Sequence, residues 1–268
     1  MTPFLRDGVT LGYDDAGHGP PVLFQHGLGG DAGQVAEVFP DAPPARRITL
    51  ECRGHGGSGG GSEPGPPDRL SIATFAGDLA ALADSLALGP AVVGGISMGA
   101  AIALRLAVRR PDLVRALVLA RPAWVAAAAP GNMRPYALVG GLIATLPPDE
   151  ARRRFEASDT AADLAARAPD NLASLQGFFG RPPGFGRLLQ AIAADGPGVS
   201  EAEIARIAVP TLVIGHGRDL AHPLAHAEAL AALVPGASLA RITPKAADLA
   251  AYVGDFRAAL GDFLARVA

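Results

Sequence analysis

The chain contains 268 residues, of which 49% are hydrophobic and 18% are charged, so it can bury a sizeable core and is not generally disordered. The formal net charge of −3 excludes the strongly basic surface that binding to nucleic acid or to anionic lipid requires. Cys52 is the only cysteine in the sequence, which excludes an internal disulfide framework.

Apolar runs rich in β-branched residues alternate with longer helical patterns, which is typical of an α/β fold. An amino-terminal hairpin around Val9–Asp14, closed by Ala16–Pro21, is expected to add antiparallel edge strands. The other predicted strands are Val22–Gln25, Arg47–Glu51, Ala91–Ile96, Arg115–Ala120, Thr211–Gly215 and Ser238–Ile242. The predicted helices are Asp31–Val38, Ser71–Leu88, Met98–Arg109, Pro223–Leu233 and Asp248–Val267. Because crossovers between parallel strands are right-handed, we predict a mainly parallel sheet with helices on both faces.

The segment from about residue 124 to residue 206 has no good strand pattern and contains helical patterns such as Asp149–Ala157 and Leu164–Gln176. It follows the fourth of the six strands just named, so we predict a helical cap inserted into an α/β core. On this interpretation the core comprises residues 1–122 and 207–268, and the cap comprises residues 123–206.

The pentapeptide Gly95-Ile96-Ser97-Met98-Gly99 fits the pattern G-x-S-x-G between a predicted strand and a predicted helix. A sharp strand-to-helix turn needs small residues around its serine, and it exposes the Ser97 hydroxyl at the carboxyl end of the sheet. The amide of Met98 then lies at a helix amino terminus, where it can donate a hydrogen bond to an oxyanion. The alternative is a glycine-packed junction in which the serine is incidental.

The sequence His26-Gly27-Leu28-Gly29-Gly30 follows the strand Val22–Gln25. A glycine-rich turn at this place can offer the backbone N–H of Leu28 as a second oxyanion donor, although it can also be an ordinary turn. We expect His26 to be a structural hydrogen-bonding residue rather than a base, and we place His26 and Gly27 beside a possible substrate pocket.

Together these motifs resemble the α/β-hydrolase superfamily with a helical cap. The resemblance spans nearly the whole chain and includes Glu51-Cys52-Arg53-Gly54-His55-Gly56-Gly57-Ser58, which is similar to the loop after the family's fourth strand. Residues 54–59 also satisfy G-x-G-x-x-G, but the sequence runs on into more glycine and proline instead of opening a helix. We therefore reject a dinucleotide site and expect a mobile loop over residues 54–67.

The resemblance implies that Asp219 is the acid of a catalytic triad, because Gly217-Arg218-Asp219 follows the strand Thr211–Gly215 and Pro223 follows four residues later. An ordinary surface-turn aspartate is the alternative. The family's histidine is expected at Ala246 or Ala247, before the final helix, and neither position holds one. Without a base to take its proton, a serine hydroxyl is a weak nucleophile.

Three interpretations follow from this absence. His222 lies three residues after Asp219 and can take the place of the base, unless it merely packs under the cap. Lys245 is the only lysine and lies beside the vacant position, where a desolvated lysine can act as a base and a solvated lysine cannot. The third interpretation is that no base is needed because the pocket binds or isomerises its ligand. His216 and His55 are weaker candidates.

Six large apolar side chains of the predicted cap region can form the ceiling of a pocket above Ser97 or can simply attach the cap to the core. They are Trp124, Met133, Tyr136, Phe178, Phe179 and Phe185. Arg121 can face a substrate carboxylate or form a salt bridge within its loop. We predict no metal site, because His222 and His226 have no third ligand in view.

The leading hypothesis is a cofactor-independent serine hydrolase of a small apolar ester, thioester or lactone, with Ser97, Asp219 and His222 as its triad. The rival is a non-hydrolytic catalyst or binding protein of the same fold, which uses the pocket and the oxyanion donors without a working triad. The sequence contains no secretory signal pattern and no apolar run of roughly 20 residues. We therefore expect a cytoplasmic protein with a small-molecule substrate and neither nucleic-acid nor membrane partners. The oligomeric state is left open.

Overall fold

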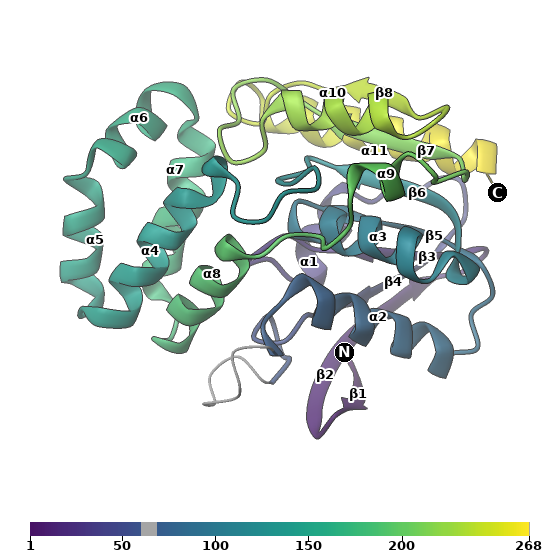
Figure 1. The fold of residues 1–268 in the computed structure, drawn as a ribbon, viewed down its shortest axis with the longest axis horizontal. Coiled ribbons are helices and arrows are strands. Elements are labelled where there is room, and N and C mark those ends of the chain that lie inside the picture. The colour runs from purple at the N-terminus through teal and green to yellow at the C-terminus, as the bar shows by residue number, and fades with distance from the viewer. Residues whose placement is uncertain (60–68, 268) are drawn as a thin grey trace.

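The computed structural model describes residues 1–59 and 69–267, and within them eight strands form one sheet (Figure 1). The strands are β1 (Thr2–Arg6), β2 (Val9–Gly17), β3 (Pro21–Gln25), β4 (Arg46–Leu50), β5 (Ala91–Ile96), β6 (Val114–Ala120), β7 (Thr211–Gly215) and β8 (Ser238–Arg241). Their order across the sheet is β1-β2-β4-β3-β5-β6-β7-β8. Strands β3 to β8 are mutually parallel, and β1 and β2 are antiparallel at one edge. The predicted mainly parallel sheet is confirmed.

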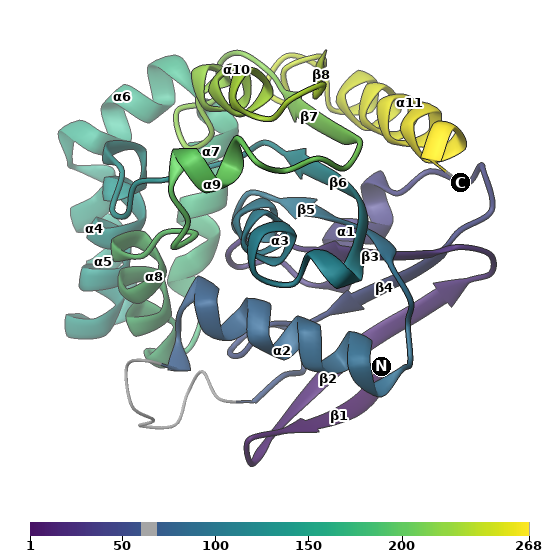
Figure 2. The same cartoon turned by 45° about the vertical axis from the view of Figure 1, so that its right-hand side comes forward.

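Helices cover both faces of this sheet, as Figure 2 shows. One face carries α1 (Ala32–Val38) and α11 (Leu249–Val267), which enclose a core that contains Phe24, Val118 and Phe256. The other face carries α2 (Ile72–Ser85), α3 (Met98–Arg109) and α10 (Leu224–Leu233). Every residue of β5 is buried, because a central parallel strand has helices on both sides. This burial explains the uninterrupted apolar runs in the sequence.

The amino-terminal hairpin differs from the prediction. Its turn is at Asp7–Gly8, between β1 and β2, and not at Ala16–Pro21. Asp7 and Gly8 have φ values of 51° and 77°, as the two central residues of a tight type I′ turn require. The Asp-Gly pair was the sequence signal for this turn. The residues Ala16 and Gly17 instead pair with β4.

Between β6 and β7 the described helices are α4 (Arg134–Thr145), α5 (Pro148–Glu156), α6 (Asp159–Arg167), α7 (Pro169–Gln176), α8 (Gly184–Ala194) and α9 (Glu201–Ile204). Figure 1 shows α4 to α8 as a separate layer beside the sheet, whereas α9 lies against α3. The helical pattern over Leu164–Gln176 falls on two helices, because the chain breaks at Ala168, whose φ and ψ are −151° and 67°. A residue before proline is pushed out of the helical region, and Pro169 then begins the next helix. The proposed boundaries of core and cap stay a prediction.

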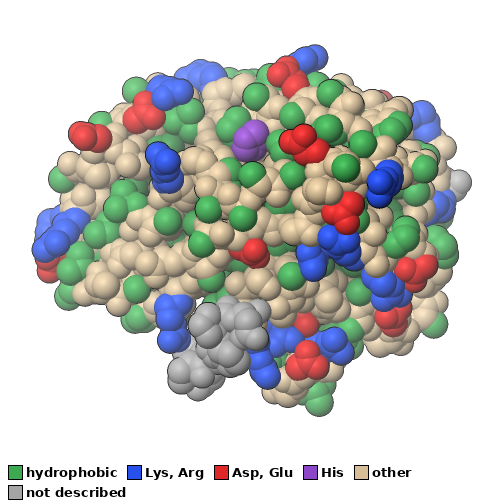
Figure 3. Space-filling view, in the orientation of Figure 1, with side chains coloured by type: hydrophobic (Ala, Val, Ile, Leu, Met, Phe, Trp, Pro, Cys, Tyr) green, Lys and Arg blue, Asp and Glu red, His purple; other side chains and the backbone are tan. Residues whose placement is uncertain are grey.

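The predicted mobile loop at residues 54–67 is described only as far as residue 59, so residues 60–67 lie outside the described residues. Over the part of the chain that is described, no helix is long and apolar enough to cross a bilayer. Figure 3 shows acidic and basic side chains interspersed over one face of the molecule. That face therefore presents no continuous block of one charge.

Candidate active site

Ser97 lies at the sharp turn between β5 and α3, with φ and ψ of 57° and −108°. A Cβ atom on Gly95 would lie 2.6 Å from the carbonyl carbon of Gly99, and one on Gly99 would overlap the backbone oxygen of Gln25. The two glycines therefore let β5, α3 and β3 approach closely enough to form the turn. This is the geometry that the G-x-S-x-G pattern indicates.

His222 contacts Ser97 directly. Its Nε2 atom lies 2.8 Å from Ser97 Oγ, although the two residues are 125 positions apart in the sequence. His222 follows β7, and Ser97 follows β5. The carboxyl ends of parallel strands lie at the same edge of the sheet, so their loops can meet there.

Asp219 holds His222 from two sides. Its carboxylate oxygens lie 3.0 and 2.9 Å from His222 Nδ1, and Oδ1 also accepts a hydrogen bond from the backbone N–H of His222 at 3.0 Å. This arrangement assigns the proton to Nδ1, which donates to Asp219 and leaves Nε2 free to accept from the Ser97 hydroxyl. Asp219, His222 and Ser97 thus form a continuous hydrogen-bonded chain.

Arg121 ends β6 and pairs with the same carboxylate. Its Nε and Nη2 atoms both contact Asp219 Oδ2, at 3.0 and 2.6 Å, and the aspartate side chain is fully buried. Arg121 therefore forms a salt bridge, but with the loop after β7 and not within its own loop as one of the two predictions had it. Burial by itself raises the pKa of Asp219, but the charges and hydrogen bonds of His222 and Arg121 outweigh it and hold that pKa well below its usual range. Asp219 is thus a carboxylate at neutral pH.

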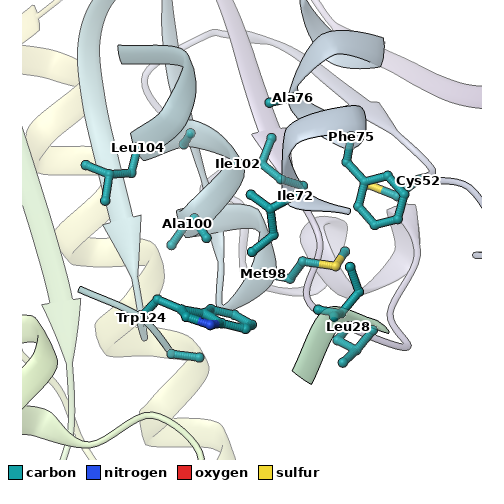
Figure 4. Packing of buried hydrophobic residues seen from close by; sticks show 14 of the residues in the cluster. Leu28, Cys52, Ile72, Phe75, Ala76, Met98, Ala100, Ile102, Leu104 and Trp124 are labelled. Carbon is teal, nitrogen blue, oxygen red and sulfur yellow. The ribbon is translucent and has the colours of Figure 1, made fainter. Parts of the chain in front are cut away.

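Two backbone amides beside Ser97 can bind an oxyanion. Among the hydrogen bonds of the described residues, none uses the backbone N–H of Leu28 or of Met98. The loop of Leu28 lies against the serine, since a Cβ atom on Gly27 would be 3.5 Å from Ser97 Cβ. Figure 4 shows the side chains of Leu28 and Met98 in one apolar cluster, which anchors both amides. Whether both amides bind an oxyanion stays a prediction.

His26 is fully buried beneath this loop. Its Nδ1 atom lies 2.8 Å from the carbonyl oxygen of Gly27, and its Nε2 atom accepts from the backbone N–H of Cys52 at 3.1 Å. Burial lowers the pKa of His26, so the neutral ring with its proton on Nδ1 fits both contacts. Both ring nitrogens of His26 thus form hydrogen bonds with backbone groups, and neither is available to bind a substrate. Gly27 in turn donates its N–H to Gln34 Oε1 at 2.7 Å.

Lys245, the second candidate base, lies against Tyr252 of α11. Its ammonium group is 5.9 Å from the centre of the Tyr252 ring. The Ser97 hydroxyl donates its hydrogen bond to Nε2 of His222 instead. His216 lies on the far side of the acid, with Nε2 3.6 Å from Asp219 Oδ2 and Nδ1 2.7 Å from the carbonyl oxygen of Gly217.

The six large apolar side chains predicted to lie above Ser97 are buried. One group of them packs on the glycine-rich loop at residues 26–30, which we call the oxyanion loop after its predicted role. The Phe178 ring packs so closely on Gly29 that a Cβ atom there would overlap it. The rings of Tyr136 and Phe185 pack against Phe178 in tilted arrangements, with ring centres at 6.3 and 5.2 Å. Trp124 donates its indole N–H to the carbonyl oxygen of Asp195 and joins the apolar cluster beside Met98 (Figure 4). Trp124 therefore attaches the segment before α9 to the sheet.

Sequence reasoning missed three polar residues between β6 and β7. Asn171 and Asn132 bind the backbone at residues 220 and 221, between Asp219 and His222. Asp170 instead lies 3.7 Å from Arg121. These residues carry no local sequence signal, because their partners lie far away in the chain. Within residues 1–59 and 69–267 no group of histidine, cysteine and carboxylate side chains is arranged to hold a metal ion.

The buried side chain of His55 makes the stability of the folded protein depend on pH. Burial lowers the pKa of His55 to about 3, with a further contribution from His26. An unfolded histidine titrates near pH 6.5, so between about pH 3 and pH 6.5 the unfolded state binds more protons and the free energy of unfolding rises with pH. We expect His55→Asn to reduce this slope by up to about 1.4 kcal/mol per pH unit in urea titrations between about pH 4 and pH 6. His18→Asn is the matched control, because that side chain is exposed; equal slopes in both variants would contradict the prediction.

The chain matches the family model for the alpha/beta hydrolase fold over residues 20–255. The protein therefore belongs to the α/β hydrolase fold family. Its sequence is 30% identical over 225 residues to a protein of Pseudomonas savastanoi pv. phaseolicola that is provisionally named carbamate hydrolase RutD, covering 82% of this chain and 83% of the relative.

Two further comparisons agree with the family. The crystal structure of an enol-lactonase from Burkholderia xenovorans LB400 superimposes with a TM-score of 0.70 and 25% identity, covering 98% of this chain and 100% of that chain. A Mycobacterium tuberculosis protein provisionally named non-heme bromoperoxidase BpoC is 39% identical over 117 residues. That match spans only 41% of the relative's length.

Proposed function

We propose that this protein is a serine hydrolase that cleaves an ester-type bond, with Ser97 as nucleophile, His222 as base and Asp219 as the acid that orients the base. The 2.8 Å contact between His222 Nε2 and Ser97 Oγ carries this proposal. The similarity to proteins named as a lactonase and a carbamate hydrolase also supports hydrolysis of a carbonyl compound. The rival hypothesis of a non-hydrolytic catalyst or binding protein was based on the lack of a base. The contact between His222 and Ser97 argues against that hypothesis.

The reaction proceeds in two stages. Ser97 Oγ attacks the carbonyl carbon while its proton passes to His222 Nε2, and the amides of Leu28 and Met98 donate hydrogen bonds to the oxyanion. His222 then gives the proton to the leaving oxygen or sulfur, which departs and leaves an acyl group on Ser97. In the second stage His222 takes a proton from water while the water oxygen attacks the acyl carbon. The bond to Ser97 Oγ then breaks, the acid is released, and His222 returns the proton to Ser97 Oγ.

The substrate that fits this proposal is a small apolar ester, thioester or lactone. The aromatic side chains of Phe178, Tyr136 and Phe185 lie over the oxyanion loop and favour an apolar acyl group. Arg121 does not favour an anionic substrate, because its Nε and Nη2 atoms already donate to Asp219.

Labelling with a fluorophosphonate tests the nucleophile. We expect wild-type protein to be labelled at Ser97, as located by peptide mass spectrometry, and to hydrolyse p-nitrophenyl acetate. Ser97→Ala should lose both properties, with kcat falling on the order of 10⁶-fold, because no other group can form the acyl intermediate. Folded wild-type protein that is not labelled, or a Ser97→Ala variant with full turnover, would refute the proposal and favour the non-hydrolytic rival.

A further inference from the structure

Asp219 and His222 occupy one short loop after β7. The two residues between them are held by Asn171 of α7. Asn171 Oδ1, from α7, accepts hydrogen bonds from the backbone N–H groups of Leu220 and Ala221, both at 2.9 Å. The side chain of Asn171 is buried, with the residue 4% exposed. A buried amide oxygen that receives two backbone donors fixes the path of the chain between Asp219 and His222.

A second contact holds the same loop from the opposite side. Asn132, just before α4, donates from Nδ2 to the carbonyl oxygen of Ala221 at 2.7 Å and to that of Ala123 at 2.9 Å. The peptide groups on either side of Ala221 are thus both tied to side chains from the segment between β6 and β7. The loop cannot shift relative to α7 without breaking these bonds.

We propose that Asn171 is a positioning residue that holds His222 in line with Ser97, so that the alignment of the base depends on where α7 sits against the sheet. This inference rests on the proposed function. The physical reason is geometric: a displacement of about 1 Å from the reactive arrangement can reduce a rate about 100-fold. In this chain the helices between β6 and β7 therefore act on the chemical step and not only on substrate entry.

Three variants test this positioning role, with full-length protein throughout. Asn171→Ala removes the shared acceptor, and we expect it to slow Ser97 phosphonylation by a small fluorophosphonate by at least about 10-fold. For p-nitrophenyl acetate we expect kcat to fall while KM changes little, because Asn171 aligns the base and does not bind the substrate. Asn171→Asp keeps an oxygen acceptor but loses the Nδ2 contact with Asp170 at 3.4 Å, so we expect it to recover part of the rate. Ser158→Ala is the matched control, since it removes the amino-terminal cap of α6 without touching the loop.

The outcomes separate this inference from the proposed function. Failure of wild-type protein to label at Ser97 would refute the proposed function itself. Labelling of wild-type and Asn171→Ala at the same rate would overturn the positioning role alone, and so would an equal slowing in Ser158→Ala. Should Asn171→Ala not fold, as judged by thermal unfolding, Asn132→Ala carries the test. That variant loses the donor to the Ala221 carbonyl and must also slow labelling.

Discussion

Replacing His222 with alanine is expected to lower kcat for p-nitrophenyl acetate on the order of 10⁶-fold, as removal of the base does in a serine protease. The reason is that Nε2 of His222 is the ring nitrogen within hydrogen-bond distance of Ser97 Oγ, at 2.8 Å. Without it the hydroxyl keeps its proton, and only the oxyanion donors and binding remain to accelerate the reaction. Steady-state hydrolysis and the rate of fluorophosphonate labelling measure this loss.

Lys245→Ala provides the matched control for this prediction. Lys245 occupies the loop after β8, where the family's histidine is expected, but its ammonium group lies over the ring of Tyr252. We therefore expect this variant to hydrolyse and label like the wild type. A large loss in Lys245→Ala together with normal labelling of His222→Ala would show that the lysine, and not the histidine, is the base.

Replacing Arg121 with methionine is expected to reduce the free energy of unfolding by about 3–5 kcal/mol, the usual cost of removing one partner from a buried ion pair. Arg121 is 8% exposed, and its partner Asp219 would be left as a buried carboxylate beside two histidines, His222 and His216, without its arginine. Urea unfolding at neutral pH measures the change. Addition of Asp219→Asn should restore part of the lost stability, because the fully buried side chain at position 219 is then uncharged.

Arg110→Met is the control for the arginine substitution. Arg110 also contacts two carboxylates, those of Asp84 and Asp112, but this group lies at the surface. Water solvates the partners that remain after its removal, so we expect little change in stability. Equal effects of the two substitutions would mean that burial of the Arg121–Asp219 pair does not determine its contribution.

Much of the fold was predictable from local sequence patterns. The six parallel strands lie within one residue of their predicted ends, because apolar β-branched runs between turn residues have few other stable conformations. The hairpin turn lies at Asp7–Gly8, where the Asp-Gly pair allows positive φ at both central positions, and not at the predicted residues 16–21. Within residues 164–176 the helical pattern does not show the break at Ala168, which Pro169 causes.

The surroundings of the candidate site were less predictable. The strand–glycine–serine–helix pattern marks Ser97 from adjacent residues alone, since the turn is a local structure. Asn171 and Asn132 carry no comparable pattern, because their role consists only of contacts to backbone groups that lie 49 and 89 positions away. Such contacts arise from the packing of α7 and of the segment before α4 against the loop after β7.

The sequence by itself determined the class of fold, the serine turn and the absence of a histidine after the last strand. Only the tertiary structure decided which of His222 and Lys245 lies against Ser97. The two loops follow β7 and β8, which are neighbouring parallel strands, so both open at the same edge of the sheet. Which of their side chains reaches Ser97 depends on the path of each loop. For the loop after β7 that path is held by Arg121, Asn132 and Asn171, from three separate parts of the chain.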